Sequence, residues 1–239
     1  MKTKIIHYCW FGGKPKPKIV RQCMESWKKY CPDWEIREWN ESNFDVNCCS
    51  FVREAHAAGK WAFVSDYCRF YALVQCGGVY LDTDVELLRP IDDLPDTFVG
   101  FECAGRVASG LIRGAEKDDP ICLEMLEGYR RSRFLREDGS YNMTVVGELE
   151  TDLLMSQGLF PDDSLQTVNG TTVFPREYFS PIDFDRGETN ITANTYSIHH
   201  YAASWISPWG KFKLKIRSMI GIKWYATLYR WKHSVKKGK

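Results

Sequence analysis

Long apolar runs are absent from this sequence of 239 residues. The longest candidate, residues 61–81, is interrupted by Asp66 and Arg69, whereas a membrane-spanning helix needs about 20 consecutive apolar residues. Residues 1–10 are too few and too mixed in character for a secretory signal. These absences predict a protein that is soluble or that lies on a membrane surface.

Cysteine pairs with the two-residue gap of a zinc knuckle or a redox motif are also absent, although the chain has nine cysteines. Two of them, Cys48 and Cys49, are adjacent, and a disulfide between neighbours is strained. The odd number and the spacing predict free thiols, which are typical of a reducing compartment such as the cytoplasm.

Acidic residues are absent after Glu188, while ten lysines and arginines lie within residues 211–239. Residues 1–210 carry 22 basic and 31 acidic residues, a net charge of −9. An acidic body does not favour a nucleic-acid partner, and a basic tail favours an anionic surface. These charges divide the chain into a catalytic body, residues 1–210, and a basic tail, residues 211–239.

The tail shows the pattern of an amphipathic helix. Apolar residues fall at positions 216, 219, 220, 224, 228 and 231, with basic residues between them. Such a helix suits the headgroup region of an anionic membrane. It predicts a peripheral protein on the inner face of the cytoplasmic membrane. The alternative is a helix that packs on the acidic body.

Hydrophobic periodicity in the body predicts alternating strands and helices, an order typical of an α/β fold. A strand over residues 4–10, a helix over 18–30 and a strand over 34–39 form a βαβ unit, which indicates a mostly parallel sheet. Further strands are predicted over residues 79–81, 98–101, 171–174 and 196–199, and further helices over 50–58, 61–76, 119–132 and 147–157.

Asp82 and Asp84 follow the short apolar strand at residues 79–81. In an extended segment, residues two apart point to the same side, so both carboxylates can bind one cation at the edge where ligands of open α/β sheets bind. Mn²⁺ and Mg²⁺ take such oxygen ligands, and a divalent cation can neutralise the charge that develops on a diphosphate leaving group. An isolated Asp-x-Asp sequence is more often a solvated turn. Here a glycine pair and a helix with charged residues precede the two acids, and this context favours a cation-binding site.

Asp66 and Arg69 lie three residues apart and therefore share one face of the predicted helix over residues 61–76. Both interrupt an apolar run, where a lone charge is costly to bury. Two compatible interpretations are open: an internal salt bridge, or side chains that hydrogen-bond the hydroxyls and the phosphate of a sugar donor.

The segment from Ser65 to Asp84 resembles the sugar-binding region of glycosyltransferase family 32. It carries SDYCRFYAL at residues 65–73 and GGVYLDTD at residues 77–84. The family includes capsular-polysaccharide and lipopolysaccharide transferases and the yeast-type initiating mannosyltransferases, and the pattern is also similar to the large glucosylating bacterial toxins. The resemblance is specific because helix charges, glycine pair, strand and acid pair keep their relative spacing.

The resemblance implies a GT-A type fold, a Rossmann-like mixed sheet flanked by helices, and a retaining transferase that uses Mn²⁺ or Mg²⁺. It implies catalytic roles for Asp66, Arg69, Asp82 and Trp205. It implies donor contacts from Trp10, Asp66, Arg69, Tyr80, Asp82, Thr83 and Ser204. Trp10 lies in a weaker match at residues 6–13, where it would stack on the nucleotide base unless it is only a core residue.

A second weak match, residues 198–205, resembles the family's C-terminal His-x-aromatic-x-x-Ser-Trp element, which in relatives closes over the diphosphate. It adds His199, His200 and Ser204 to Asp82 and Asp84 as candidate metal ligands. Trp205 would donate to the phosphate or to the leaving oxygen. Adjacent strand residues face opposite ways, so one histidine can point into the core. A buried structural strand is the alternative for the whole segment.

Together these features predict a hexosyltransferase that moves a sugar from a nucleotide-sugar donor, with UDP-hexose favoured, to a saccharide acceptor. A lipid-linked oligosaccharide of bacterial capsule or O-antigen synthesis is consistent with the basic tail. One alternative is a non-catalytic, membrane-associated protein that binds sugar nucleotides. Phosphohydrolases of the haloacid dehalogenase type also carry Asp-x-Asp after a strand, but they use Thr or Val where this chain has Glu86.

Overall fold

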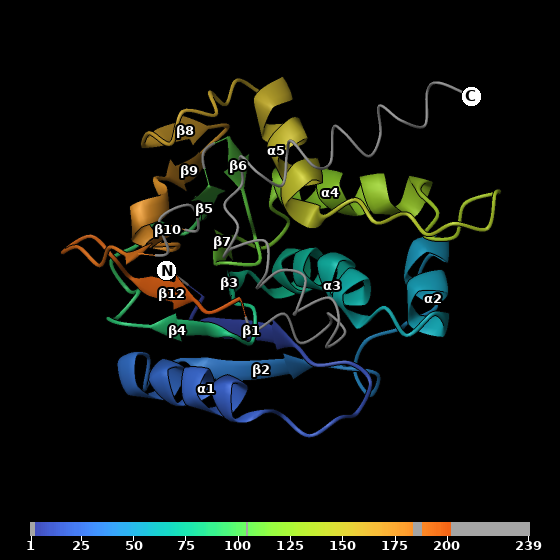
Figure 1. Ribbon diagram of the computed structural model, residues 1–239, viewed down its shortest axis with the longest axis horizontal. Helices are drawn as coiled ribbons and strands as arrows, with labels where there is room; N and C mark the ends of the chain where they lie inside the picture. Colours follow the sequence, from blue (N-terminus) through green and yellow to red (C-terminus); the bar gives the residue numbers. More distant parts are fainter. Residues whose placement is uncertain (1–2, 104, 184–187, 202–239) are drawn as a thin grey trace, which may run out of the picture. The chain divides into compact units, whose positions relative to one another are not determined.

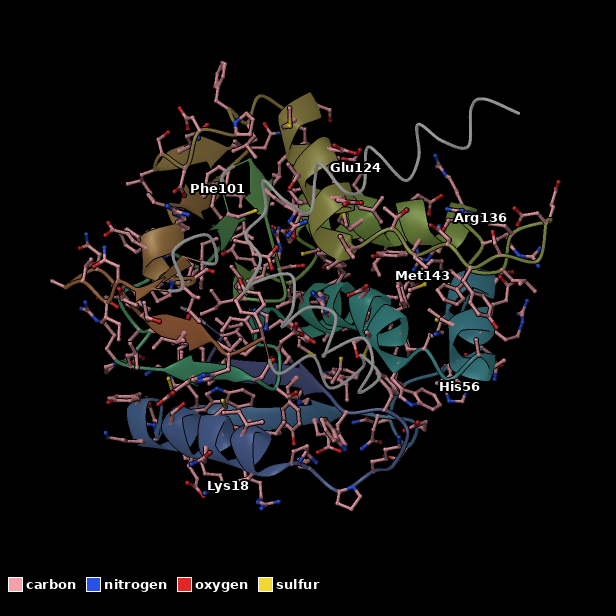
Figure 2. The ribbon with its side chains drawn as sticks, viewed as in Figure 1. Lys18, His56, Phe101, Glu124, Arg136 and Met143 are labelled. Carbon is pink, nitrogen blue, oxygen red and sulfur yellow. The ribbon has the colours of Figure 1, made fainter. Side chains whose placement is uncertain are left out.

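A mixed β-sheet lies at the centre of the computed structural model, which describes residues 3–103, 105–183 and 188–201 (Figure 1). Its strands are β1 Ile5–Cys9, β2 Glu35–Trp39, β3 Gly78–Tyr80, β5 Phe98–Cys103, β6 Arg106–Val107, β7 Arg113–Ala115, β8 Gln166–Val168 and β9 Thr171–Phe174. The order is β2–β1–β3–β7–β5–β9–β8, with β6 paired to β5. The pairs β1–β2, β1–β3 and β5–β9 are parallel and the others are antiparallel.

The helices agree closely with those predicted from the hydrophobic periodicity. The described residues form α1 Lys18–Tyr30, α2 Ser50–Ala57, α3 Trp61–Cys76, α4 Pro120–Arg131, α5 Val146–Ser156 and the 3₁₀ turn η1 Arg176–Tyr178. In α4 the start is set by Asp119, whose carboxylate accepts the backbone N–H of Cys122, followed by a proline at the first turn. The helix predicted over residues 216–231 lies outside the described residues.

The parallel part of the sheet confirms the predicted βαβ unit, because β1 and β2 are adjacent and parallel and α1 connects them. The sheet becomes mixed through β7, which lies antiparallel between β3 and β5. This strand was not predicted, since Arg113-Gly114-Ala115 has no apolar or alternating pattern. It fits there because Gly114 lies against the Phe98 ring, where a β-carbon would come within 2.3 Å.

The two faces of the sheet carry separate hydrophobic cores. Helix α3 contacts β1, β3 and β7, with α2 and α4 packed on it, and this core includes Tyr80. The opposite core includes Ile6, Val79 and Trp27 of α1. Figure 1 shows α1 and α3 on opposite sides of the β1–β2–β3 part of the sheet. Alternation along β3 therefore directs the side chain of Tyr80 toward α3.

Strands β4 (Val85–Leu87) and β12 (Ser197–His199) form an antiparallel pair outside the main sheet. Helix α1 supports β4, because the indole N–H of Trp27 donates to the Val85 carbonyl and the Ser26 hydroxyl accepts the Leu87 N–H. The pair thereby brings residues near the C-terminal end of the described chain to the segment that follows β3.

The chain divides into two compact units, and the elements above belong to the first, Met1–Pro181 with Ile191–Tyr201. The second unit is Ile182–Asn190 with Ala202–Lys239. Of this unit the structure describes the antiparallel pair β10 (Ile182–Asp183) and β11 (Glu188–Thr189). The proposed boundary between body and tail at residue 210 lies outside the described residues.

All nine cysteines are free thiols in the structure. Among the described helices, none combines the length and the apolar character that crossing a bilayer requires.

His7 is a fully buried histidine of β1 that connects three parts of the sheet. Its Nε2 lies 2.8 Å from the carbonyl of Gly77, and its Nδ1 accepts the indole N–H of Trp39 at 3.0 Å. Because Trp39 can only donate, Nδ1 carries no proton and Nε2–H donates to Gly77. Burial lowers the pKa of His7 to about 4, although the hydrogen bond to Gly77 acts in the opposite direction.

We predict that the protein loses stability as the pH falls from 6.5 through 4, in part because of His7. The unfolded chain protonates this imidazole near pH 6.5 and the folded chain resists protonation until about pH 4, so protonation favours unfolding by about 3 kcal/mol at the acidic limit. Urea unfolding at a series of pH values measures this loss. His7→Gln, which can keep both hydrogen bonds without titrating, should flatten the pH dependence over this window, while the control His56→Gln should not.

Candidate functional site

The candidate site lies at the carboxyl ends of β1 and β3. Strand β2, which follows β1 in the chain, lies on one side of β1, and β3, which follows β2, lies on the other side. The direction of strand order therefore reverses between β1 and β3. Ligands of open α/β sheets bind at such a position. Trp10 follows β1, and Asp82 follows β3 after Leu81, whose N–H still donates to the His7 carbonyl.

The acid pair is presented by a turn. The N–H of Val85 donates to the carbonyl of Asp82 at 3.0 Å, which closes a four-residue turn from Asp82 to Val85. This corrects the expectation of an extended segment in which residues two apart share a side. The two carboxylates nevertheless lie together, because the turn reverses the chain between β3 and β4.

Asp82, Asp84 and His199 form a group that could hold a metal ion. Each offers one ligand atom, and these atoms lie within 4.8 Å of one another. The Nε2 of His199 is 3.1 Å from a carboxylate oxygen of Asp84. Two carboxylates with an imidazole suit Mn²⁺, and the oxygen ligands also suit Mg²⁺, so the donor set fits the cation expected from the sequence.

The environment of His199 is both buried and acidic. Burial acts to lower its pKa, but the hydrogen bond and charge of Asp84, with the charges of Asp82 and Glu102, outweigh it and raise the pKa above the ordinary value. Its Nδ1 is buried and has no hydrogen-bond partner among the described residues. Two carboxylates around an incompletely bonded imidazole form a centre that favours positive charge.

The structure distinguishes the two histidines that the sequence left open. In the β4–β12 pair, His199 lies opposite Val85, and the N–H of His200 donates to the Asp84 carbonyl. The side chain of His200 points to Glu86, with 2.8 Å between Nε2 and the carboxylate. His199 therefore joins the acid pair and His200 does not, in agreement with the alternation of neighbouring strand residues.

Three contacts hold Asp82 in place. Its Oδ1 accepts a hydrogen bond from the Tyr80 hydroxyl at 2.9 Å and lies 3.4 Å from an Nη of Arg69. Its backbone N–H donates to the carbonyl of Gly110 at 3.1 Å. Tyr80, which the resemblance placed among the donor-binding residues, is fully buried and here supports Asp82.

Arg69 and Asp66 form a buried ion pair of 2.9 Å next to Asp82. The guanidinium lies over the Tyr80 ring, 4.9 Å from its centroid, and its Nη1 is buried without a hydrogen-bond partner among the described residues. Burial and the charge of Asp82 raise the pKa of Asp66 to about 7 against the opposing effect of Arg69. The salt bridge, one of the two interpretations of the sequence, is confirmed. It leaves the N–H groups of Arg69 Nη1 without a partner among the described residues, so they can meet an oxygen of a ligand.

The remaining candidates are placed unevenly. Trp10 is half-buried, its indole N–H donates to the Lys14 carbonyl, and the Lys16 ammonium lies 5.6 Å from its ring centroid. Thr83 is at the apex of the turn between the two acids. Ser204 and Trp205 lie outside the described residues.

Gly110 is a site residue to which the sequence assigned no firm role. A β-carbon at this position would come within 2.6 Å of Asp82 Oδ2 and 3.1 Å of Arg69 Nη1. It lies in the segment between β6 and β7, far from the acid pair in sequence. No local pattern marks it, because the requirement for glycine arises from a neighbour 28 positions away in the chain, an interval that follows from the two residue numbers.

Comparison with known proteins gives a match over part of the chain. Residues 17–99 match the family described as "Glycosyltransferase sugar-binding region containing DXD motif". An uncharacterized protein of Arabidopsis thaliana, At4g19900, is 32% identical in an alignment of 122 residues, and the match covers 44% of this chain and 19% of that protein. The chain thus spans about a fifth of that relative. The family match contains Asp66, Arg69, Asp82 and Asp84 and supports a glycosyltransferase family, whereas the segments around Trp10 and His199 lie outside it.

A solved structure shares the fold. The PaToxG glycosyltransferase superimposes with a TM-score of 0.50 and 18% identity, over 66% of this chain and 70% of that chain. The central mixed sheet flanked by helices is therefore similar to that of GT-A glycosyltransferases, which confirms the predicted fold class. A glycosyltransferase involved in the glycosylation of the major capsid of PBCV-1 superimposes with a TM-score of 0.46 and 13% identity, over 84% of this chain and 94% of that chain.

We predict that Gly110→Ala destabilises the protein by about 1–3 kcal/mol, because the added methyl group overlaps the Asp82 carboxylate and the surrounding backbone must move. The matched control is Gly128→Ala in α4, where a β-carbon meets nothing within 4 Å. That change should stabilise the protein by about 0.5–1 kcal/mol through helix propensity. Urea unfolding of the two variants measures both effects, and equal stability of Gly110→Ala and wild type would contradict the close contact.

Proposed function

We propose that this protein is a metal-dependent glycosyltransferase that transfers a sugar from a nucleotide-sugar donor to a saccharide acceptor. The observation that carries the proposal is the grouping of Asp82, Asp84 and His199 within 4.8 Å at the carboxyl end of a parallel strand pair. Arg69, with an unpartnered buried N–H, lies at the same place. The DXD family match and the GT-A-like sheet support sugar transfer in general.

Asp82, Asp84 and His199 would hold the cation, with Ser204 as a further candidate from the sequence. Bound there, Mn²⁺ or Mg²⁺ supplies electrostatic stabilisation for the negative charge that develops on the leaving diphosphate. Tyr80 and the Gly110 carbonyl fix Asp82 in one orientation. Because the Asp82 side chain is already fixed, it would lose little conformational freedom on binding the cation, which favours metal affinity.

The neighbouring side chains would bind the donor. Arg69 offers an N–H to a phosphate or sugar oxygen, and Asp66 keeps the guanidinium in position. Trp10 lies after β1 and offers an aromatic face to the nucleotide base, a contact worth about 1–3 kcal/mol. Lys16 already lies over that ring, so the base would share or replace a cation–π contact.

We further propose UDP-hexose as the donor and a retaining reaction, on the basis of the sequence resemblance. A lipid-linked oligosaccharide of bacterial capsule or O-antigen synthesis is the proposed acceptor. Support for it comes from the basic, aromatic tail, which suits the inner face of an anionic membrane.

We predict slow, Mn²⁺-dependent release of nucleotide from one member of a panel of UDP- and GDP-sugars. Asp84→Ala should lower the rate at least about 100-fold, because it removes a carboxylate from the site that stabilises the leaving group. Asp152→Ala, which removes an exposed carboxylate in α5, is the matched control and should behave like wild type. Release of inorganic phosphate from a simple phosphate ester would instead support a phosphohydrolase. Equal rates for wild type and Asp84→Ala would reject the metal-dependent assignment.

We predict that deleting residues 211–239 releases the protein from vesicles of phosphatidylcholine with phosphatidylglycerol. Each of the ten basic residues removed contributes about 1 kcal/mol near an anionic leaflet. Sedimentation of the full chain and the truncated chain with anionic and with neutral vesicles measures the effect. Lys28→Glu with Lys29→Glu, which changes the charge of the body alone, should leave binding intact. Continued sedimentation of the truncated chain would show that the tail is not the anchor.

A further inference from the structure

We propose that Glu150 of α5 is a positioning residue that holds Asp82 in its metal-binding place through the segment Val107–Leu111. The inference deepens the proposed function and rests on it, because the placement of Asp82 matters for a bound cation. Among the described residues, Glu150 makes no hydrogen bond to Asp82 or to the groups that bind Asp82, which are Tyr80, Arg69 and the Gly110 carbonyl. It acts through the loop between β6 and β7.

Glu150 binds two residues on either side of Gly110, Ser109 in the loop and Arg113 at the start of β7. Its Oε2 accepts the backbone N–H of Ser109 at 3.0 Å, and its Oε1 accepts from an Nη of Arg113 at 2.7 Å. Arg113 in turn lies 3.3 Å from Asp119, the N-cap of α4. The side chains of Glu150 and Arg113 are both fully buried, so water does not compete for these bonds.

The next residue of α5 fixes the start of the same loop. The N–H of Val107 donates to the Thr151 hydroxyl oxygen at 3.0 Å, and that hydroxyl donates to the Gly147 carbonyl. The loop is closed on itself by a hydrogen bond of 3.1 Å from Leu111 N–H to the Ala108 carbonyl. One turn of α5 therefore supports the β6–β7 loop, together with β5, whose Gly100 carbonyl accepts the Ala108 N–H at 3.1 Å.

The loop transmits this position to Asp82 in two ways. The Gly110 carbonyl accepts the Asp82 N–H, and the Gly110 backbone faces the Asp82 carboxylate so closely that a β-carbon would come within 2.6 Å. A small outward movement of the loop would break the first contact, and a small inward movement would displace the carboxylate. The orientation of Asp82 is therefore coupled to the bonds that Glu150 makes.

Stability alone is a weak explanation for this arrangement. A buried ion pair costs desolvation and is often replaceable by apolar residues without loss of stability. Two directional bonds from one carboxylate specify a loop position that apolar packing does not specify. The Glu150–Arg113 pair thus suits a role in geometry.

The test compares Glu150→Gln with Glu54→Gln in the full chain. Glu54 of α2 makes comparable bonds, because it accepts backbone N–H groups of Phe134 and Leu135 and binds Arg133. Among the described residues, no hydrogen bond or ion pair joins these three residues to Asp82. Mn²⁺ affinity is measured by calorimetric titration well below the unfolding temperature. Glu150→Gln should bind Mn²⁺ about 10–100-fold more weakly, whereas Glu54→Gln should bind like wild type.

Amide hydrogen exchange without added metal gives a second readout. In Glu150→Gln the amides of Val107, Ser109 and Asp82 should exchange faster, and in Glu54→Gln those of Phe134 and Leu135 should. A purely structural role would lower the unfolding temperature in both variants and leave Mn²⁺ affinity unchanged in both.

A second variant covers the case in which Glu150→Gln does not fold. Thr151→Val keeps the buried ion pair and removes the acceptor for Val107, so it should also weaken Mn²⁺ binding, and Thr151→Ser should restore it. Wild-type Mn²⁺ affinity in folded Glu150→Gln or in Thr151→Val overturns the proposal. If the wild-type chain itself does not bind Mn²⁺, the proposed metal site is overturned. The wild-type titration therefore distinguishes failure of the metal site from failure of the positioning role of Glu150.

Discussion

The antiparallel pairing of β4 with β12 is the interaction on which the candidate site depends. It joins His199 to Asp84 across 115 positions of the chain. The register places His199 opposite Val85, one residue after the acid pair, and a shift of one residue would offer Ile198 instead. Trp27 and Ser26 of α1 hold β4 from the other side, so the register is supported by the hydrophobic core.

Burial gives the charges of the site their strength. Arg69, Asp66 and Tyr80 are almost fully buried. The interactions of Arg69 with Asp66 and Asp82, and of Tyr80 with Asp82, are therefore weakly screened. The same condition makes each unmatched polar atom costly. The free Nη1 of Arg69 and the free Nδ1 of His199 are such atoms among the described residues, and both lie beside the acid pair. Polar atoms without hydrogen-bond partners around two carboxylates suit a site that binds a polar, charged ligand better than they suit the protein interior.

The helices and the parallel strands could be predicted because their signals are local. Helix α3 and strand β3 follow from periodicity and from Gly77, which ends the helix at a positive φ of 64°. The choice between His199 and His200 could not be predicted, since it depends on pairing with a distant strand. Strand β7 could not be predicted because its three residues, centred on a glycine, carry no pattern. It is a strand because β3 pairs with one of its edges and β5 pairs with the other.

The roles of Gly110 and Glu150 were hidden for a related reason. Each is defined by a partner from another element: the Asp82 carboxylate for Gly110, and the Ser109 amide for Glu150. A single sequence contains the residues and not their distances. The acid pair was recognised because the two members lie two positions apart, yet even there the sequence suggested an extended segment and the structure has a turn.

The late position of β12 also determines when the site can form during synthesis. The βαβ unit, α3 and the acid pair are complete once the chain has emerged to about residue 87, but His199 is added more than a hundred residues later. Closing a segment of that length costs about 4 kcal/mol of chain entropy, which the folded sheet and α1 must offset. A nascent or truncated chain that ends before β12 would display two carboxylates on a turn without their imidazole. A chain must therefore be synthesised through β12 before Asp82, Asp84 and His199 can lie together.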